Sequence, residues 1–164
     1  MGYDVHRLVS GRSLVLGGIV INYHLGLDGH SDADVLLHAL IDAMFGAAGM
    51  RDIGYHFPPG DERYRGIKSL MLLAETKKLL VAEGWKIINA DMTVIAEAPK
   101  LAPYIEVMRE KIAETLVVPV CCISVKATTT EGLGVCGRQE GIAAQAVVLI
   151  EKSAHPGPVG HEAV

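Results

Sequence analysis

The sequence lacks the features that mark secreted and membrane proteins. It has three cysteines, an odd number without a C-x-x-C pair, which indicates reduced thiols in the cytoplasm. Its apolar runs are short and interrupted, well under the ~20 residues that a helix needs to cross a bilayer. Its first residues have no basic segment followed by an apolar one, so they do not resemble a signal peptide. We therefore expect a cytoplasmic protein that does not enter a membrane.

Positive charge is also sparse. The net charge is −4 and no run is rich in Lys or Arg, which argues against nucleic acid or a membrane surface as a partner. An anionic substrate remains compatible with this charge, because a metal ion or backbone N–H groups can hold phosphate.

The length and composition predict one domain. The chain has 164 residues, half of them hydrophobic, which is enough for a packed core. We place this domain at residues 1–152. Residues 153–164 contain two prolines, two glycines and two histidines without periodicity, and we expect this tail to be disordered.

Apolar periodicity and turn residues predict the secondary structure. Two β-rich runs around Gly17-Gly18 predict a hairpin. The first helix is expected over 35–50, with Ser31 or Asp32 as its N-cap and Gly49 as its stop. A long loop over 51–66 follows. The remaining helices are expected over 69–84 and 102–116, and the remaining strands over 85–98, 122–128 and 141–150.

This order of elements predicts the α+β class, with a small mixed β-sheet and helices packed on one face. The strand over 141–150 is mostly apolar, which is typical of a strand buried on both faces. Helices on one side of the sheet would bury only one of these faces. We therefore expect the other face to pack against another subunit.

Three residues have the chemistry of a metal site. Asp4 and His6 are two positions apart, so their side chains share one face if the segment is a strand. His38 lies within an apolar helical segment. Two histidines and a carboxylate suit Zn²⁺ with a fourth position open to a substrate. The alternative is that His38 is a core histidine satisfied by Asp34 or Asp42, each one helical turn away.

Two further segments carry groups that suit phosphate. His30, Ser31 and Asp32 stand at the start of the first helix, where they either cap it or meet a phosphate at its N-terminus. The segment KATTTEGLGVCGR has hydroxyls, glycines and Glu131, which suit a phosphate cradle and a Mg²⁺ ligand. The alternative for this segment is a β-hairpin with a wide turn.

Two loop segments are compatible with nucleotide binding. Asp52 is either a turn residue or an acceptor for ribose hydroxyls. The segment AEAPKLAP offers free backbone groups that could read a base, and Lys100 could meet a phosphate. A simple strand-to-helix connection explains AEAPKLAP equally well.

Five segments together resemble a known family. GYDVHRL, GHSDADVLLHALIDAMFGAAG, DIGYHFP, IAEAPKLAPY and VKATTTEGLG are similar in order and spacing to the motifs of 2-C-methyl-D-erythritol 2,4-cyclodiphosphate synthases, from residue 2 to about residue 150. The resemblance implies a homotrimer with active sites between subunits. It also implies that Arg138 and Glu140 line a central cavity of the trimer.

The resemblance implies a role for each matching residue. Asp4, His6 and His38 match the Zn²⁺ ligands, and Glu131 matches the ligand of a second ion, Mg²⁺ or Mn²⁺. Glu131, Thr129 and His30 are the implied catalytic residues. The implied substrate-binding residues are Asp4, His6, His30, Ser31, Asp52, Ile53, Gly54, Asp61, Ala96, Pro99, Lys100, Leu101, Thr128, Thr129, Thr130 and Arg138.

The implied reaction belongs to non-mevalonate isoprenoid precursor biosynthesis. It cyclises 4-diphosphocytidyl-2-C-methyl-D-erythritol 2-phosphate to 2-C-methyl-D-erythritol 2,4-cyclodiphosphate and releases CMP, which makes the enzyme a phosphorus-oxygen lyase. The residue types alone also permit a metal-dependent phosphohydrolase or a non-catalytic nucleotide- or isoprenoid-binding trimer.

Overall fold

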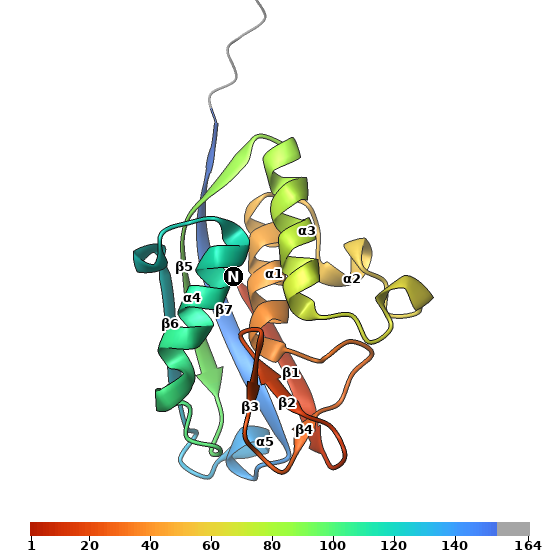
Figure 1. The fold of residues 1–164 in the computed structure, drawn as a ribbon, viewed down its shortest axis with the longest axis vertical. Helices are drawn as coiled ribbons and strands as arrows, with labels where there is room; N and C mark the ends of the chain where they lie inside the picture. The colour runs from red at the N-terminus through yellow and green to blue at the C-terminus, as the bar shows by residue number, and fades with distance from the viewer. Residues whose placement is uncertain (154–164) are drawn as a thin grey trace, which may run out of the picture.

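The core of the protein is a five-stranded sheet, described by a computed structural model over residues 1–153 (Figure 1). The strand order is β4-β1-β7-β5-β6. Strands β5 and β6 are parallel, and the other neighbours are antiparallel. The bounds are Gly2–Val9 for β1, Gly26–Leu27 for β4, Trp85–Ile95 for β5, Ile123–Thr128 for β6 and Gly141–Lys152 for β7.

Three long helices lie together on one side of this sheet (Figure 1). They are α1 (Val35–Ala47), α3 (Ser69–Ala82) and α4 (Ile105–Leu116). Shorter helical turns are α2 (Ile53–His56), α5 (Gly134–Gly137), η1 (Glu62–Tyr64), η2 (Ala102–Tyr104) and η3 (Val120–Cys122). The predicted α+β class and one-sided helix packing are confirmed. The predicted loop over 51–66 is more ordered than expected, because it contains α2 and η1.

The predicted hairpin is present as β2 (Leu14–Leu16) and β3 (Ile19–Ile21). Gly17 and Gly18 both have positive φ, which a two-residue turn of this hand requires. A Cβ on Gly17 would lie 2.7 Å from Cγ of Met108 in α4. The turn therefore needs glycine both for its backbone conformation and for its contact with the helix.

The N-cap of α1 is Asp34, so the expected caps Ser31 and Asp32 are wrong. The Asp34 carboxylate accepts from the N–H of Leu37 at 3.1 Å. It also accepts from the N–H groups of Gly17 at 3.0 Å and Gly18 at 2.7 Å. Burial raises its pKa to about 6, although these donors act in the opposite direction. One buried carboxylate thus joins the start of α1 to the hairpin turn.

The face of the sheet opposite the helices is open in the single chain, and it is apolar along β1 and the second half of β7. Tyr3 and Val5 of β1 are exposed there, as are Val147 and Leu149 of β7, each 55% exposed. The second half of β7 is thus exposed on this face in the single chain, and its burial against another subunit stays a prediction. The three long helices α1, α3 and α4 all lie on the other side of the sheet (Figure 1).

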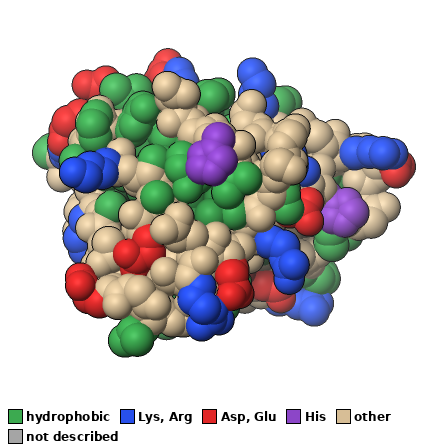
Figure 2. All heavy atoms as spheres, turned by 90° about the horizontal axis from the view of Figure 1, so that it is seen from below, with side chains coloured by type: hydrophobic (Ala, Val, Ile, Leu, Met, Phe, Trp, Pro, Cys, Tyr) green, Lys and Arg blue, Asp and Glu red, His purple; other side chains and the backbone are tan. Residues whose placement is uncertain are grey.

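Charge is mixed on the surface that Figure 2 shows. On that face Lys and Arg side chains alternate with Asp and Glu and do not gather into one positive patch. Within residues 1–153 there is no helix with the length and apolar character needed to cross a bilayer. The tail predicted at 153–164 lies outside the described residues, apart from Ser153, whose N–H donates to the carbonyl of Gly84 at 2.7 Å.

We expect Asp34→Ala to lower the free energy of unfolding by roughly 2–4 kcal/mol, because it removes a helix cap and leaves buried N–H donors without an acceptor. Urea unfolding at a fixed protein concentration measures the loss. Glu75→Ala is the control, since it removes an exposed ion pair with Lys78 and should change stability by about 0.5 kcal/mol or less. Equal losses in the two variants would contradict the role assigned to Asp34.

Candidate active site

A close approach of β1 to α1 brings the expected metal ligands together. Successive residues of β1 point to opposite faces of the sheet, and Gly2, Asp4 and His6 are on the face that packs against α1. A Cβ on Gly2 would lie 2.0 Å from the carbonyl oxygen of Ala39 and 2.6 Å from the nitrogen of Ala43. Only glycine permits this distance between strand and helix, and the helix carries His38 beside Ala39.

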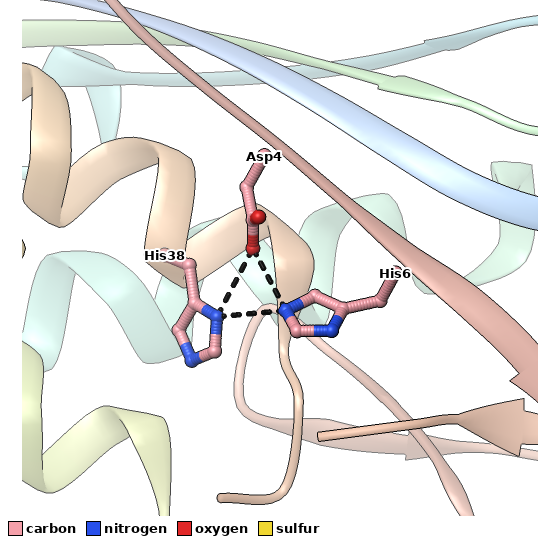
Figure 3. A group of neighbouring side chains, drawn as sticks. All are labelled: Asp4, His6 and His38. Carbon is pink, nitrogen blue, oxygen red and sulfur yellow. Dashed lines mark hydrogen bonds and ion pairs between the residues drawn. The ribbon is translucent and has the colours of Figure 1, made fainter. Parts of the chain in front are cut away.

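The three side chains converge on one point (Figure 3). Oδ2 of Asp4 lies 3.0 Å from Nε2 of His6 and 3.1 Å from Nδ1 of His38, and the two ring nitrogens are 3.2 Å apart. Within the described residues this is the one group of three or more His, Cys, Asp or Glu side chains whose ligand atoms lie close enough to bind the same ion.

Hydrogen bonds on the far side of each ring aim a lone pair at this point. Nδ1 of His6 lies 2.6 Å from the carbonyl oxygen of Asp28, which can only accept, so Nδ1 carries the proton. Nε2 of His38 lies 2.9 Å from Oγ of Ser69. In the neutral form the His6 ring therefore directs its unprotonated nitrogen toward Asp4, and the His38 ring does the same if Ser69 Oγ accepts from its Nε2.

The spacing of these atoms fits zinc. Tetrahedral Zn²⁺ with bonds of about 2.0–2.1 Å places its ligand atoms about 3.3 Å apart. The three observed separations, 3.0, 3.1 and 3.2 Å, are close to that value. Two imidazoles and a carboxylate are also a donor set that zinc accepts, with a fourth position left for a substrate.

The electrostatics favour a charged carboxylate at this point. Burial by itself would raise the pKa of Asp4, but the hydrogen bonds and charges of His38 and His6 hold that pKa well below its usual range. Burial would lower the pKa of His6, but Asp4 raises it through its hydrogen bond and its charge. A metal ion and a proton thus compete for the same lone pair of His6.

The alternative role of His38, a core histidine satisfied by Asp34 or Asp42, is wrong. The Asp34 carboxylate is committed to backbone N–H groups, and Asp42 accepts from the N–H of Ile53 at 3.2 Å. The His38 ring instead contacts Asp4 on one side and Ser69 on the other.

A cavity of about 280 Å³ opens beside the three ligands. Its polar wall includes His30 and Ser31, and its apolar wall is formed around Phe57, Ile67 and Leu72. Of the expected site residues it collects His6, His30, Ser31, His38, Ile53 and Gly54.

A second cavity of about 260 Å³ lies between the ends of β5 and β6 and the start of α4. Of the expected residues it collects Ala96, Pro99, Lys100, Leu101, Thr128 and Thr129. The alternative of a hairpin after Thr128 is wrong, because β5 lies between β6 and β7. Glu131 is exposed and accepts from Oγ1 of Thr129 at 3.0 Å.

Three expected residues have local partners and do not line either cavity. Asp52 caps α2 through the N–H of Tyr55 at 2.9 Å, as its turn role predicts. Asp61 pairs with Arg63 at 2.6 Å. Arg138 pairs with Glu140 at 2.7 Å on the exposed surface after α5.

Sequence reasoning missed the role of Glu97. Its Oε1 accepts from the N–H groups of Thr130 at 2.9 Å and Gly132 at 3.1 Å, and from Oγ1 of Thr130. These hydrogen bonds lower its pKa and hold the turn that carries Thr129 and Glu131. Glu97 follows β5 by two residues, and no pattern near it in the sequence indicates a partner more than 30 residues away.

Comparison with known proteins identifies the family. The family model described as "YgbB family" matches residues 1–151. The chain belongs to the YgbB family.

Two bacterial relatives are 2-C-methyl-D-erythritol 2,4-cyclodiphosphate synthases. The 2-C-methyl-D-erythritol 2,4-cyclodiphosphate synthase of Moorella thermoacetica is 61% identical over 91% of each chain. The synthase of that name from Syntrophomonas wolfei is 59% identical over 93% of this chain and 97% of its own. A solved YgbB-type structure, IspF of Plasmodium falciparum in complex with CDP, matches with a TM-score of 0.81 at 32% identity, over 93% of this chain and 94% of its own.

We expect His38→Ala to reduce bound zinc from about one equivalent per chain to near zero, because two remaining protein ligands hold zinc weakly. Elemental analysis of the purified protein measures the zinc content. His24→Ala is a matched control, since His24 is exposed and packs edge-on against Tyr23. An unchanged zinc content in His38→Ala would remove this residue from the ligand set.

Proposed function

We propose that this protein converts 4-diphosphocytidyl-2-C-methyl-D-erythritol 2-phosphate to 2-C-methyl-D-erythritol 2,4-cyclodiphosphate and CMP, as a synthase of the non-mevalonate isoprenoid pathway. The observation that carries the proposal is the convergence of Asp4, His6 and His38 beside a cavity, in a chain of this family. We further propose that it acts in the cytoplasm, which is compatible with its three free cysteines.

The proposed ions are Zn²⁺ at Asp4, His6 and His38 and Mg²⁺ or Mn²⁺ at Glu131. When bound, these ions would neutralise charge on the diphosphate and polarise its oxygens. Glu131 suits the second ion because Mg²⁺ is commonly held by one or two carboxylates together with substrate phosphates. Its exposure leaves the carboxylate accessible to such an ion.

The cavity beside the zinc ligands is proposed to hold the methylerythritol phosphate end of the substrate. His30 and Ser31 stand in its wall and can donate to phosphate oxygens. Ile53 and Gly54 line the same wall. We assign Asp52 and Asp61, at the N-caps of α2 and η1, to the polar groups of the substrate around this cavity.

The second cavity is proposed to hold cytidine and its phosphates. Backbone groups of Ala96, Pro99 and Leu101 can read the base there, and Lys100 can pair with phosphate. The hydroxyls of Thr128, Thr129 and Thr130 supply donors for the diphosphate. The CDP complex of the Plasmodium falciparum relative supports a cytidine nucleotide as the ligand.

The reaction needs positioning more than it needs a base. The attacking oxygen belongs to the 2-phosphate, which is already an anion, and it displaces CMP at the β-phosphorus. The repulsion between the two anionic groups must be overcome, and holding them in line can contribute up to ~7–11 kcal/mol to lowering the barrier. His30, Thr129 and Glu131 are the residues that we assign to this alignment.

A homotrimer is proposed as the active assembly. The open apolar face formed around Tyr3, Val5, Val147 and Leu149 supports it, because such a face is costly to leave in water. We assign Arg138 and Glu140, which form an exposed ion pair, to the surface around the trimer axis.

Phosphorus NMR of a metal-replete assay with the cytidine substrate tests the reaction. We expect one CMP and one cyclic diphosphate for each substrate, with no inorganic phosphate. A zinc-dependent phosphohydrolase would give inorganic phosphate or linear products instead. No turnover of any cytidine diphosphate ester by the zinc-loaded protein would favour a binding protein.

We expect Glu131→Gln to keep its zinc and lose Mg²⁺-dependent turnover by about two orders of magnitude or more, because an amide is a weak ligand for a hard cation. Zinc analysis and steady-state rates against Mg²⁺ concentration measure the two effects. Glu110→Gln is the control, since Glu110 is an exposed glutamate of α4. A normal rate in Glu131→Gln would exclude this carboxylate from the second ion site.

A further inference from the structure

The His38 ring is held from behind by a buried chain of hydrogen bonds. Its Nε2 lies 2.9 Å from Oγ of Ser69, a fully buried residue at the first position of α3. Oγ of Ser69 donates to Oδ1 of Asp32 at 2.5 Å, and the N–H of Ser69 donates to Oδ2 of Asp32 at 3.0 Å. The carboxylate thus accepts from both hydrogen-bond donors of Ser69, its N–H and its hydroxyl.

The direction of this chain follows from the chemistry of its members. A carboxylate can only accept, so the hydroxyl proton of Ser69 points to Asp32. The lone pairs of Oγ are then free to accept a proton from Nε2 of His38. A neutral His38 protonated at Nε2 presents a lone pair at Nδ1, which is the atom that faces Asp4 and His6.

A second hydroxyl near His38 is a weaker partner. Oγ of Ser31 lies 3.3 Å from Nε2, and it also accepts from the N–H of Ala33 at 3.0 Å. Its bond to the ring is longer than that of Ser69, and no carboxylate fixes its proton. The orientation of the ring therefore depends chiefly on Ser69.

We propose that Asp32 and Ser69 are positioning residues that fix the tautomer and the ring orientation of His38, and thereby set the affinity and geometry of the metal site. Residues that hold a metal-ligating histidine in this way commonly change metal affinity by 10–100-fold when they are removed. The inference rests on the proposed zinc ligands Asp4, His6 and His38. It adds Asp32 and Ser69, which are not ligands themselves.

Ser69→Ala removes the central residue of this chain of hydrogen bonds. We expect zinc affinity, measured by competition with a chelator, to fall by about 10–100-fold, and the visible absorption of the Co²⁺-substituted protein to change. Thr76→Val is the matched control. Thr76 is a fully buried hydroxyl residue of the same helix, and its Oγ1 donates to the carbonyl of Leu72 at 2.9 Å. We expect this control to lower the melting temperature without changing zinc affinity or the Co²⁺ spectrum.

Asp32→Asn is a second variant, which changes the direction of the hydrogen bonds between His38, Ser69 and residue 32 with little change in side-chain volume. The two donors of Ser69 bind different carboxylate oxygens, and the amide replaces one of these oxygens with an NH2 group, so one of the two donors loses its acceptor. The N–H is fixed in the backbone, whereas the hydroxyl can rotate. The hydroxyl then turns its proton toward His38 and disfavours the tautomer that ligates, so this variant too should bind zinc more weakly.

The outcomes separate the proposals. Wild-type zinc affinity and Co²⁺ spectrum in both Ser69→Ala and Asp32→Asn would overturn the positioning role, whatever their melting temperatures. A wild-type protein that binds no zinc would overturn the ligand set as well. Weaker binding in both variants, with Thr76→Val unchanged, is the expected result.

Discussion

Three electron-pair donors held about 3 Å apart are the constraint on which the rest of the site depends. One carboxylate oxygen and two ring nitrogens point at one another from Asp4, His6 and His38. Such an arrangement is repulsive unless a cation lies among the donors. Each ring is fixed from behind, His6 by a backbone carbonyl and His38 by Ser69, so neither can turn away to relieve the repulsion. Metal binding should therefore stabilise the folded chain as well as serve the reaction.

Backbone features far from the ligands maintain this arrangement. Gly2 allows β1 to approach α1 more closely than any side chain would permit. Asp34 fixes where α1 starts by capping it and by binding the β2–β3 turn, and this start determines where His38 lies one turn later. The guanidinium of Arg12 donates to the carbonyls of Gly29 at 2.7 Å and Ser31 at 2.6 Å, which holds the loop between β4 and α1 against the cavity.

Local patterns in the sequence predicted the local structure well and the long-range contacts poorly. The hairpin at Gly17-Gly18, the three long helices and the pairing of Asp4 with His6 on one strand face all follow from neighbours within a few residues. Ser31 and Asp32 were wrong as N-caps of α1. Residue preference cannot tell which of several neighbouring side-chain oxygens reaches the first N–H groups of the helix, and in the structure that oxygen belongs to Asp34. The pairings of β7 with β1 and β5 and of β5 with β6 join positions more than 30 residues apart, as do the contacts of Glu97 with the 130–132 turn and of Ser69 with Asp32. Such contacts arise from packing and leave no periodic trace.

The sheet register supports the proposed location of the active site between two copies of the chain. Val5 pairs with Ala143, Ala143 with Ile95 and Ile95 with Thr128, so Thr128 lies level with the metal ligands but three strand spacings away, about 14 Å. Directly paired residues point to the same face of a sheet, which puts Thr128 on the face of Val5. Asp4 and His6 point to the opposite, helix-covered face. Among residues 1–153, none lines both cavities. A diphosphate held by Thr128 would have to cross the sheet to reach Asp4 of its own chain. The metal ligands of a second copy, docked against the open apolar face, could meet it directly, and the proposed trimer supplies that copy.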